Sequence, residues 1–192
     1  MSHSGHRLFP LPLALAFVFT TVLHAQNPTP APAAAPDLSD PEVAHVAVTA
    51  NSIDIDAAKF AQTRTQNPAV KQFAATMITD HTAVNAQAAA LATKLGVTPA
   101  DNAVSQSLES GAKQAHAALE PLHGAAFDRA YMEREVGYHQ AVLDAIDKLL
   151  IPTTENAELR KLLVDVRPAI ATHLEHAKQL KAQLSPPARA GR

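Results

Sequence analysis

The chain has 192 residues, which is enough for one domain with a sizeable hydrophobic core. Its 16 lysines and arginines nearly balance its 18 aspartates and glutamates, and no basic block is present, so we do not expect nucleic acid as a partner. The absence of cysteine excludes disulfides, thiolate metal ligands and a cysteine nucleophile.

The first 25 residues have the pattern of a signal peptide. Arg7 supplies a positive charge, residues 13–23 form an apolar stretch, and Ala25 ends a plausible cleavage site. The alternative is an uncleaved membrane anchor, but the apolar run of residues 8–23 contains two prolines and is short for a span. We therefore predict a periplasmic or secreted protein with no stable membrane span after cleavage.

The composition then divides the chain into a tether, a domain and a tail. Residues 26–40 are rich in proline and alanine and lack periodicity, which predicts an extended tether. A helical domain is expected over residues 41–184, followed by a disordered tail at 185–192.

From residue 40 onward, apolar residues recur at helical spacing. Asp40 and Asn67 each precede a proline and are predicted as N-caps, while Gly96 and Pro152 are predicted to end helices. The expected helices cover residues 41–65, 68–95, 99–119, 125–150 and 156–184.

The pattern predicts an all-α fold. No segment shows the alternation typical of a strand. Four long amphipathic helices bury their apolar stripes against one another in a four-helix bundle. Short turns make the first two and the last two long helices antiparallel pairs, and the shorter helix lies in the crossover between the pairs.

Each long helix carries one polar residue on or beside its apolar stripe. These residues are Asp54, His81, His139 and His173. The first two lie at nearly equal distances along the chain from Asn67, and the last two lie at equal distances from Asn156. Because an α-helix rises by about 1.5 Å per residue, each pair is expected at one height in the bundle.

Two interpretations of these four residues remain open. Three imidazoles and a carboxylate suit a transition metal such as zinc, iron or copper. The candidates for residues that support such ligands are Asn85, Tyr131, Glu135 and His176. The alternative is a buried polar layer without metal, which the sequence favours because di-iron bundles use more carboxylates and Glu-x-x-His pairs. The charge run at residues 133–135 is expected on a wet helix face.

Several stretches resemble one known family. They are residues 67–74 (NPAVKQFA), residues 77–81 (MITDH) with Asn85, residues 124–132 (GAAFDRAYM) with His139, and residues 168–174 (PAIATHL). The family is domain of unknown function 4142, and the resemblance covers about residues 41–182. It implies a ferritin-like bundle and a bacterial envelope setting, and it supplies no agreed activity. The chain departs from the family pattern at Tyr138, where an aspartate is usual, and at Asp54, where a glutamate is common.

The function expected from the sequence is an exported, non-enzymatic helical-bundle protein of unknown activity, either metal-binding or related to envelope stress. One alternative is a metal-dependent redox enzyme that uses the inner histidine cluster. Another is a non-catalytic protein-interaction module. A retained transition metal would favour the enzyme, and a contiguous exposed apolar patch would favour the module. The partner and the oligomeric state are left open by the sequence.

Overall fold

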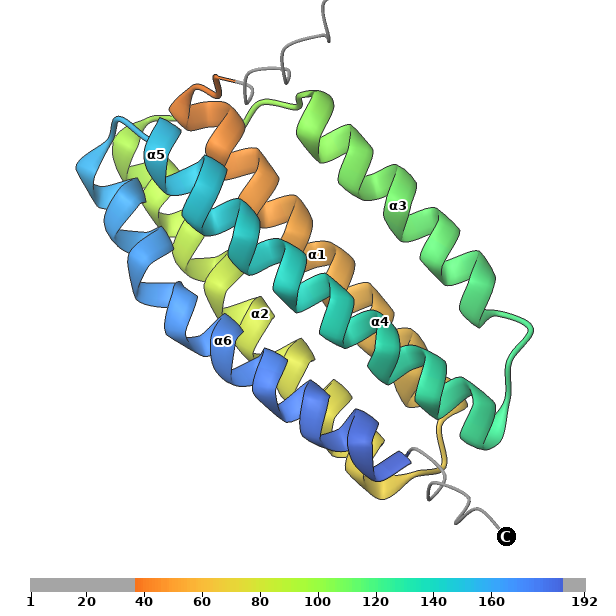
Figure 1. Ribbon diagram of the computed structural model, residues 1–192. Helices are drawn as coiled ribbons and strands as arrows, with labels where there is room; N and C mark the ends of the chain where they lie inside the picture. The colour runs from red at the N-terminus through yellow and green to blue at the C-terminus, as the bar shows by residue number, and fades with distance from the viewer. Residues whose placement is uncertain (1–36, 185–192) are drawn as a thin grey trace, which may run out of the picture. The chain divides into compact units, whose positions relative to one another are not determined.

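The computed structural model describes residues 37–184, and these residues confirm the predicted all-α bundle (Figure 1). The elements are α1 (Asp40–Arg64), α2 (Pro68–Leu95), α3 (Ala103–Leu119), α4 (Gly124–Ala145), the π-helical turn η1 (Ile146–Leu150), α5 (Ile151–Thr153) and α6 (Ala157–Leu184). The predicted signal peptide, most of the tether and the tail lie outside the described residues, so these assignments stay predictions.

The four long helices form two antiparallel pairs, as the short turns predict. Helix α1 packs along α2, and α4 packs along α6, with further contacts between α2 and α6. Helix α3 is the crossover helix, and it lies along the outside of α1 and α4 (Figure 1). The crossover therefore carries the chain from one end of the bundle to the other, where α4 begins.

The start of α1 differs from the prediction that Asp40 is its N-cap. Ser39 is the cap, and its backbone N–H donates to the Glu42 carboxylate at 2.9 Å. Asp40 instead accepts hydrogen bonds from the backbone N–H groups of Glu155 (2.8 Å) and Asn156 (2.9 Å). Serine and aspartate are both good N-cap residues. Here the Asp40 carboxylate binds the turn before α6, and Ser39 is the N-cap.

The helix ends were predicted correctly at Gly96 and incorrectly at Pro152. Gly96 has a positive φ of 63°, the left-handed conformation in which glycine commonly ends a helix. The helical chain passes Pro152 and continues to Thr153, after the wider turn of η1. In that turn the Ile151 N–H donates to the Ile146 carbonyl, five residues back. The backbone hydrogen bonds have therefore already changed from the α-helical to the π-helical pattern before the proline.

The buried core forms two clusters at opposite ends of the bundle. The first contains aromatic residues and alanines from the end where α1 meets α2, including Phe73, Phe127 and Tyr131, all with 0% exposure. The second contains leucine, isoleucine and valine from the other end, including Leu163 and Ile170. The polar residues singled out by the sequence lie between these clusters. Within residues 37–184, no helix has the length and hydrophobicity needed to cross a membrane.

Candidate metal centre

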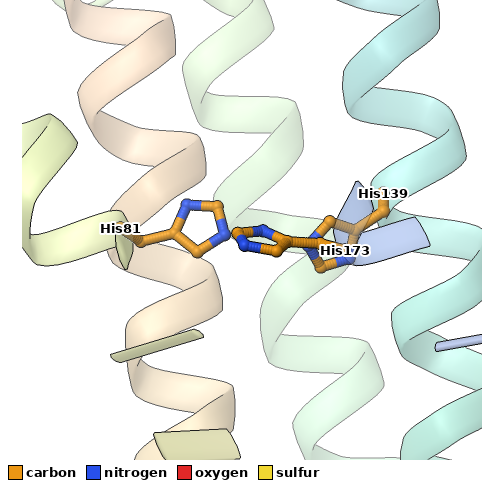
Figure 2. Close-up of side chains that lie close together, drawn as sticks. All are labelled: His81, His139 and His173. Carbon is orange, nitrogen blue, oxygen red and sulfur yellow. The ribbon is translucent and has the colours of Figure 1, made fainter. Parts of the chain in front are cut away.

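The structure brings the three inner histidines together in the middle of the bundle. Figure 2 shows the rings of His81, His139 and His173 pointing toward one another from α2, α4 and α6. Their ring centroids are 5.3–5.8 Å apart. One ring nitrogen from each histidine lies within 4.8 Å of the other two, and all three residues are buried. This spacing allows a single ion to be bound by all three with small side-chain movements.

Each imidazole is held by a hydrogen bond from one of its two nitrogens. Nδ1 of His81 lies 2.6 Å from the side-chain carbonyl oxygen of Asn51. Nδ1 of His139 lies 3.0 Å from the backbone carbonyl of Glu135, and Nε2 of His173 lies 3.0 Å from a carboxylate oxygen of Asp80. Because all three partners are acceptors, each of these nitrogens carries the proton.

The other nitrogen of each ring is buried and has no hydrogen-bond partner. These atoms are His81 Nε2, His139 Nε2 and His173 Nδ1. In a neutral imidazole the nitrogen without the proton carries a lone pair, which is the form that binds a metal. Leaving a buried acceptor unpaired costs free energy, so three such atoms on neighbouring rings need an explanation.

Burial keeps His81 and His139 neutral. It lowers the pKa of His81 to about 4, although the nearby Asp54 carboxylate acts in the opposite direction. Burial likewise lowers the pKa of His139, again against the effect of Asp54. At neutral pH these two rings therefore present lone pairs toward the centre of the cluster.

Asp54 supplies a carboxylate beside two of the rings. Its Oδ2 lies 3.2 Å from His81 Nε2 and 3.9 Å from His139 Nε2, and the residue has 0% exposure. Its Oδ1 accepts a hydrogen bond from Arg134 at 2.7 Å. Burial raises the pKa of Asp54, but the Arg134 guanidinium and the two imidazoles outweigh it and hold the pKa below its usual value. Asp54 is thus a buried anion with one oxygen facing the histidines.

Of the charge run at residues 133–135, Glu133 lies on an exposed helix face as the sequence predicts, whereas Arg134 and Glu135 do not. Glu135 has 0% exposure, and only 11% of the Arg134 side chain is exposed. Arg134 Nη1 donates to Glu135 Oε1 at 2.5 Å, and the guanidinium lies 4.2 Å from the centre of the Tyr138 ring. Burial raises the pKa of Glu135 well above its usual range, and the charge of Asp54 adds to this effect against that of Arg134.

The predicted supporting residues differ in how close they come to the cluster. Glu135 is close, since its Oε2 lies 3.4 Å from His139 Nδ1. The Tyr131 hydroxyl is buried one helical turn before Glu135. The amide of Asn85 donates to Ser52, and the half-buried ring of His176 packs against Phe73 at 5.3 Å. A supporting role for these residues stays a prediction.

Sequence reasoning missed three residues that hold the cluster. Asn51 and Asp80 fix two of the imidazoles, and Arg134 pairs with the buried carboxylates. A signal existed for Asn51, because it lies three residues before Asp54 and therefore on the same helix face. Asp80 immediately precedes His81 and binds across to α6, which only the packing of the helices reveals.

An apolar cavity of about 700 Å³ lies at the end of the bundle that contains Leu163 and extends as far as Asn51 and Tyr138. Most of its wall comes from aliphatic side chains of the four long helices. Near the cluster it is lined by Asn51, which holds His81, and by Tyr138, whose hydroxyl donates to the Ala50 carbonyl at 2.8 Å.

Comparison with known proteins identifies the family. The model of the family described as domain of unknown function, DUF4142, matches residues 25–180. The chain belongs to this family. No protein of curated function matches it. Among solved structures, the chain is similar to one described as CopM in the Cu(II)-bound form, with 16% sequence identity and a TM-score of 0.59. The match covers 78% of this chain and 100% of that chain, and at this identity it shows a shared fold.

Proposed function

We propose that this protein binds one divalent transition metal ion through His81, His139 and His173, with the Asp54 carboxylate as a fourth ligand. One observation carries the proposal. Each of the three imidazoles is fixed through one nitrogen, the other nitrogen is buried and unpaired, and the three rings point toward one another. Metal-binding histidines in proteins characteristically donate their second nitrogen to a carboxylate, an amide or a backbone carbonyl.

The alternative of a metal-free polar layer fits these contacts less well. A satisfied layer would pair both nitrogens of each ring, because an unpaired buried acceptor costs about 1–3 kcal/mol. Here three ring nitrogens and one oxygen each of Asp54 and Glu135 lack partners. A bound cation would satisfy the three ring nitrogens and the Asp54 oxygen together, since all of them carry lone pairs or negative charge.

The donor set favours copper(II) or zinc over softer or harder ions. Imidazole suits copper, zinc, iron and nickel, whereas magnesium and calcium prefer oxygen ligands. Affinity for a given site of this kind generally peaks at copper(II) in the divalent series. The structural similarity to CopM in its Cu(II)-bound form supports testing copper(II) first.

The same donor set supports binding rather than catalysis. Structural zinc sites use four protein ligands, whereas catalytic sites keep one position open for water or substrate. Three histidines and Asp54 supply four donors, and each of these residues is at most 6% exposed. We therefore propose a role in metal storage or buffering, carried out after export to the bacterial periplasm.

Titration of the untagged, chelator-stripped protein tests the proposal. Calorimetry with copper(II) and zinc should give one ion per chain, and His81→Ala should weaken binding by at least 100-fold. His123→Ala is the matched control, because His123 is an exposed histidine at the start of α4 and should leave binding unchanged. Electron paramagnetic resonance of the copper(II) form should show coupling to several nitrogens in the wild type.

Two outcomes would overturn the proposal. The first is no tight binding of either metal by the wild type, and the second is equal loss of binding in His81→Ala and His123→Ala. Thermal melting gives an independent readout, since a ligand at 1,000 times its Kd stabilises the folded state by about 4 kcal/mol. The metal should raise the melting temperature of the wild type and leave that of His81→Ala unchanged.

A further inference from the structure

The centre contains a second group of donors beside the three histidines. Asp54, Glu135 and His139 each offer one ligand atom within 4.8 Å of the other two, and all three residues are buried. Asp54 Oδ2 and Glu135 Oε2 have no hydrogen-bond partner. This group shares His139 with the histidine group, so the two groups adjoin one another. Di-metal centres of ferritin-like bundles place two ions between carboxylates and histidines in a comparable way.

Arg134 already supplies the positive charge that a second ion would bring. Its Nη1 lies 2.7 Å from Asp54 Oδ1 and 2.5 Å from Glu135 Oε1, so a single nitrogen bridges both carboxylates. The guanidinium is packed over the Tyr138 ring and is mostly buried, so it is not displaced easily into solvent. An arginine stays charged under all ordinary conditions, unlike a metal ion, which dissociates.

We propose that Arg134 takes the place of a second metal ion and limits this centre to one. The inference rests on the proposed metal site at the three histidines. A second divalent ion between Asp54 and Glu135 would have to lie beside the fixed guanidinium and compete with it for both carboxylates. Like charges at this separation repel strongly in a buried site.

The number of ions bound per chain tests this role. The full chain is stripped with chelator, dialysed against a small excess of zinc, and analysed for bound zinc. The wild type should bind one ion per chain, and Arg134→Met, which keeps the apolar stem and removes the charge, should bind two. Arg134→Lys is the matched control, since it keeps the positive charge and should bind one.

A double variant locates the second ion. Arg134→Met combined with Glu135→Gln removes a carboxylate as well as the guanidinium, so it should return to one ion per chain. Two ions in the double variant would show that the additional ion binds elsewhere and would overturn the inference. Two ions in the wild type, or equal numbers of ions in the wild type and in a folded Arg134→Met protein, would overturn it as well.

The outcomes separate this inference from the proposed function. A wild type that binds no ion contradicts the proposed function. If Arg134→Met binds one ion in that case, the result still supports the role of Arg134. If neither protein binds an ion, both the proposed function and this inference are contradicted. If Arg134→Met does not fold, the wild type with two equivalents of copper(II) decides. One bound copper whose paramagnetic signal has full intensity supports the inference, whereas two bound ions with a signal weakened by coupling overturn it.

Discussion

The two ends of the bundle core are packed differently, although the same four long helices form both. At the end where α1 meets α2, the large side chains of Phe73, Phe127 and Tyr131 have 0% exposure and their rings contact one another. At the other end, aliphatic side chains such as Leu163 and Ile170 surround a cavity of about 700 Å³. The histidine cluster lies between a filled region and a hollow one.

This difference places the histidine cluster between a closely packed region and a region with open space. Close packing transmits small changes in volume, so the filled end fixes the helix positions from which the ligands project. The hollow end lacks such close packing and leaves space beside Asn51, which holds His81. Substitutions should therefore have larger effects on stability at the filled end.

The largest difference is expected between Phe73→Ala and Leu163→Ala. Phe73 is fully enclosed by neighbours, so its removal should cost about 3–5 kcal/mol. Leu163 is also buried but borders the cavity, so its truncation enlarges existing space and should cost about 2 kcal/mol, the lower limit for such changes. Equilibrium unfolding of the metal-free proteins in urea measures both values. An equal or greater loss at Leu163 would contradict the proposed difference in packing.

The cluster between the two ends should make the metal-free protein sensitive to acid. The pKa of His81 is about 4 in the folded protein and about 6.5 in the unfolded chain, so the unfolded chain takes up a proton first as the pH falls. The stability that His81 contributes is therefore complete above pH 6.5 and is lost as the pH falls toward 4. The loss amounts to about 3 kcal/mol.

Comparison with His81→Gln isolates this effect. Between pH 7 and pH 4, the wild type should lose about 3 kcal/mol more than the variant. Glu135, whose raised pKa acts in the opposite direction over this range, is present in both proteins and cancels from the difference. Parallel stability curves for the two proteins would show that His81 does not titrate in this way.

Replacing an alanine by leucine should lower stability at the filled end and leave it nearly unchanged at the hollow end. Ala58 has 0% exposure within the filled end, so Ala58→Leu should cost about 1–3 kcal/mol through overpacking. Ala88 lines the cavity, so Ala88→Leu has space for the added atoms and should change stability by less than about 0.5 kcal/mol. Thermal melting of the two variants distinguishes them, and a large loss in Ala88→Leu would show that the cavity is not available space.

The smallest difference between the two ends is expected at the helix caps, where both ends should behave alike. Asn67 caps α2 at the filled end, and Asn156 accepts hydrogen bonds from the first-turn amides of α6 at the hollow end. Replacing either by alanine should cost about 1 kcal/mol, because a cap acts on its own helix whatever the core contains. Urea unfolding checks this equality, and a clear difference would link capping to core packing.

The sequence alone determined the helices, their pairing and the residues that meet at the centre. Apolar spacing and capping act within one or two turns of the same chain, so the caps at Asn67 and Gly96 could be recognised without tertiary information. Equal chain distances from the two turns also predicted that Asp54 meets His81 and that His139 meets His173, as the distances show.

The tertiary structure decided which polar atoms are paired and which are not. The rotation and spacing of neighbouring helices bury Arg134 between Asp54 and Glu135, a contact that the sequence did not predict. The same packing aligns Asp80 with His173 across two helices. Such contacts depend on side chains far apart in the sequence, and no local pattern specifies their geometry. The unpaired imidazole nitrogens that support a metal site are therefore a property of the folded bundle.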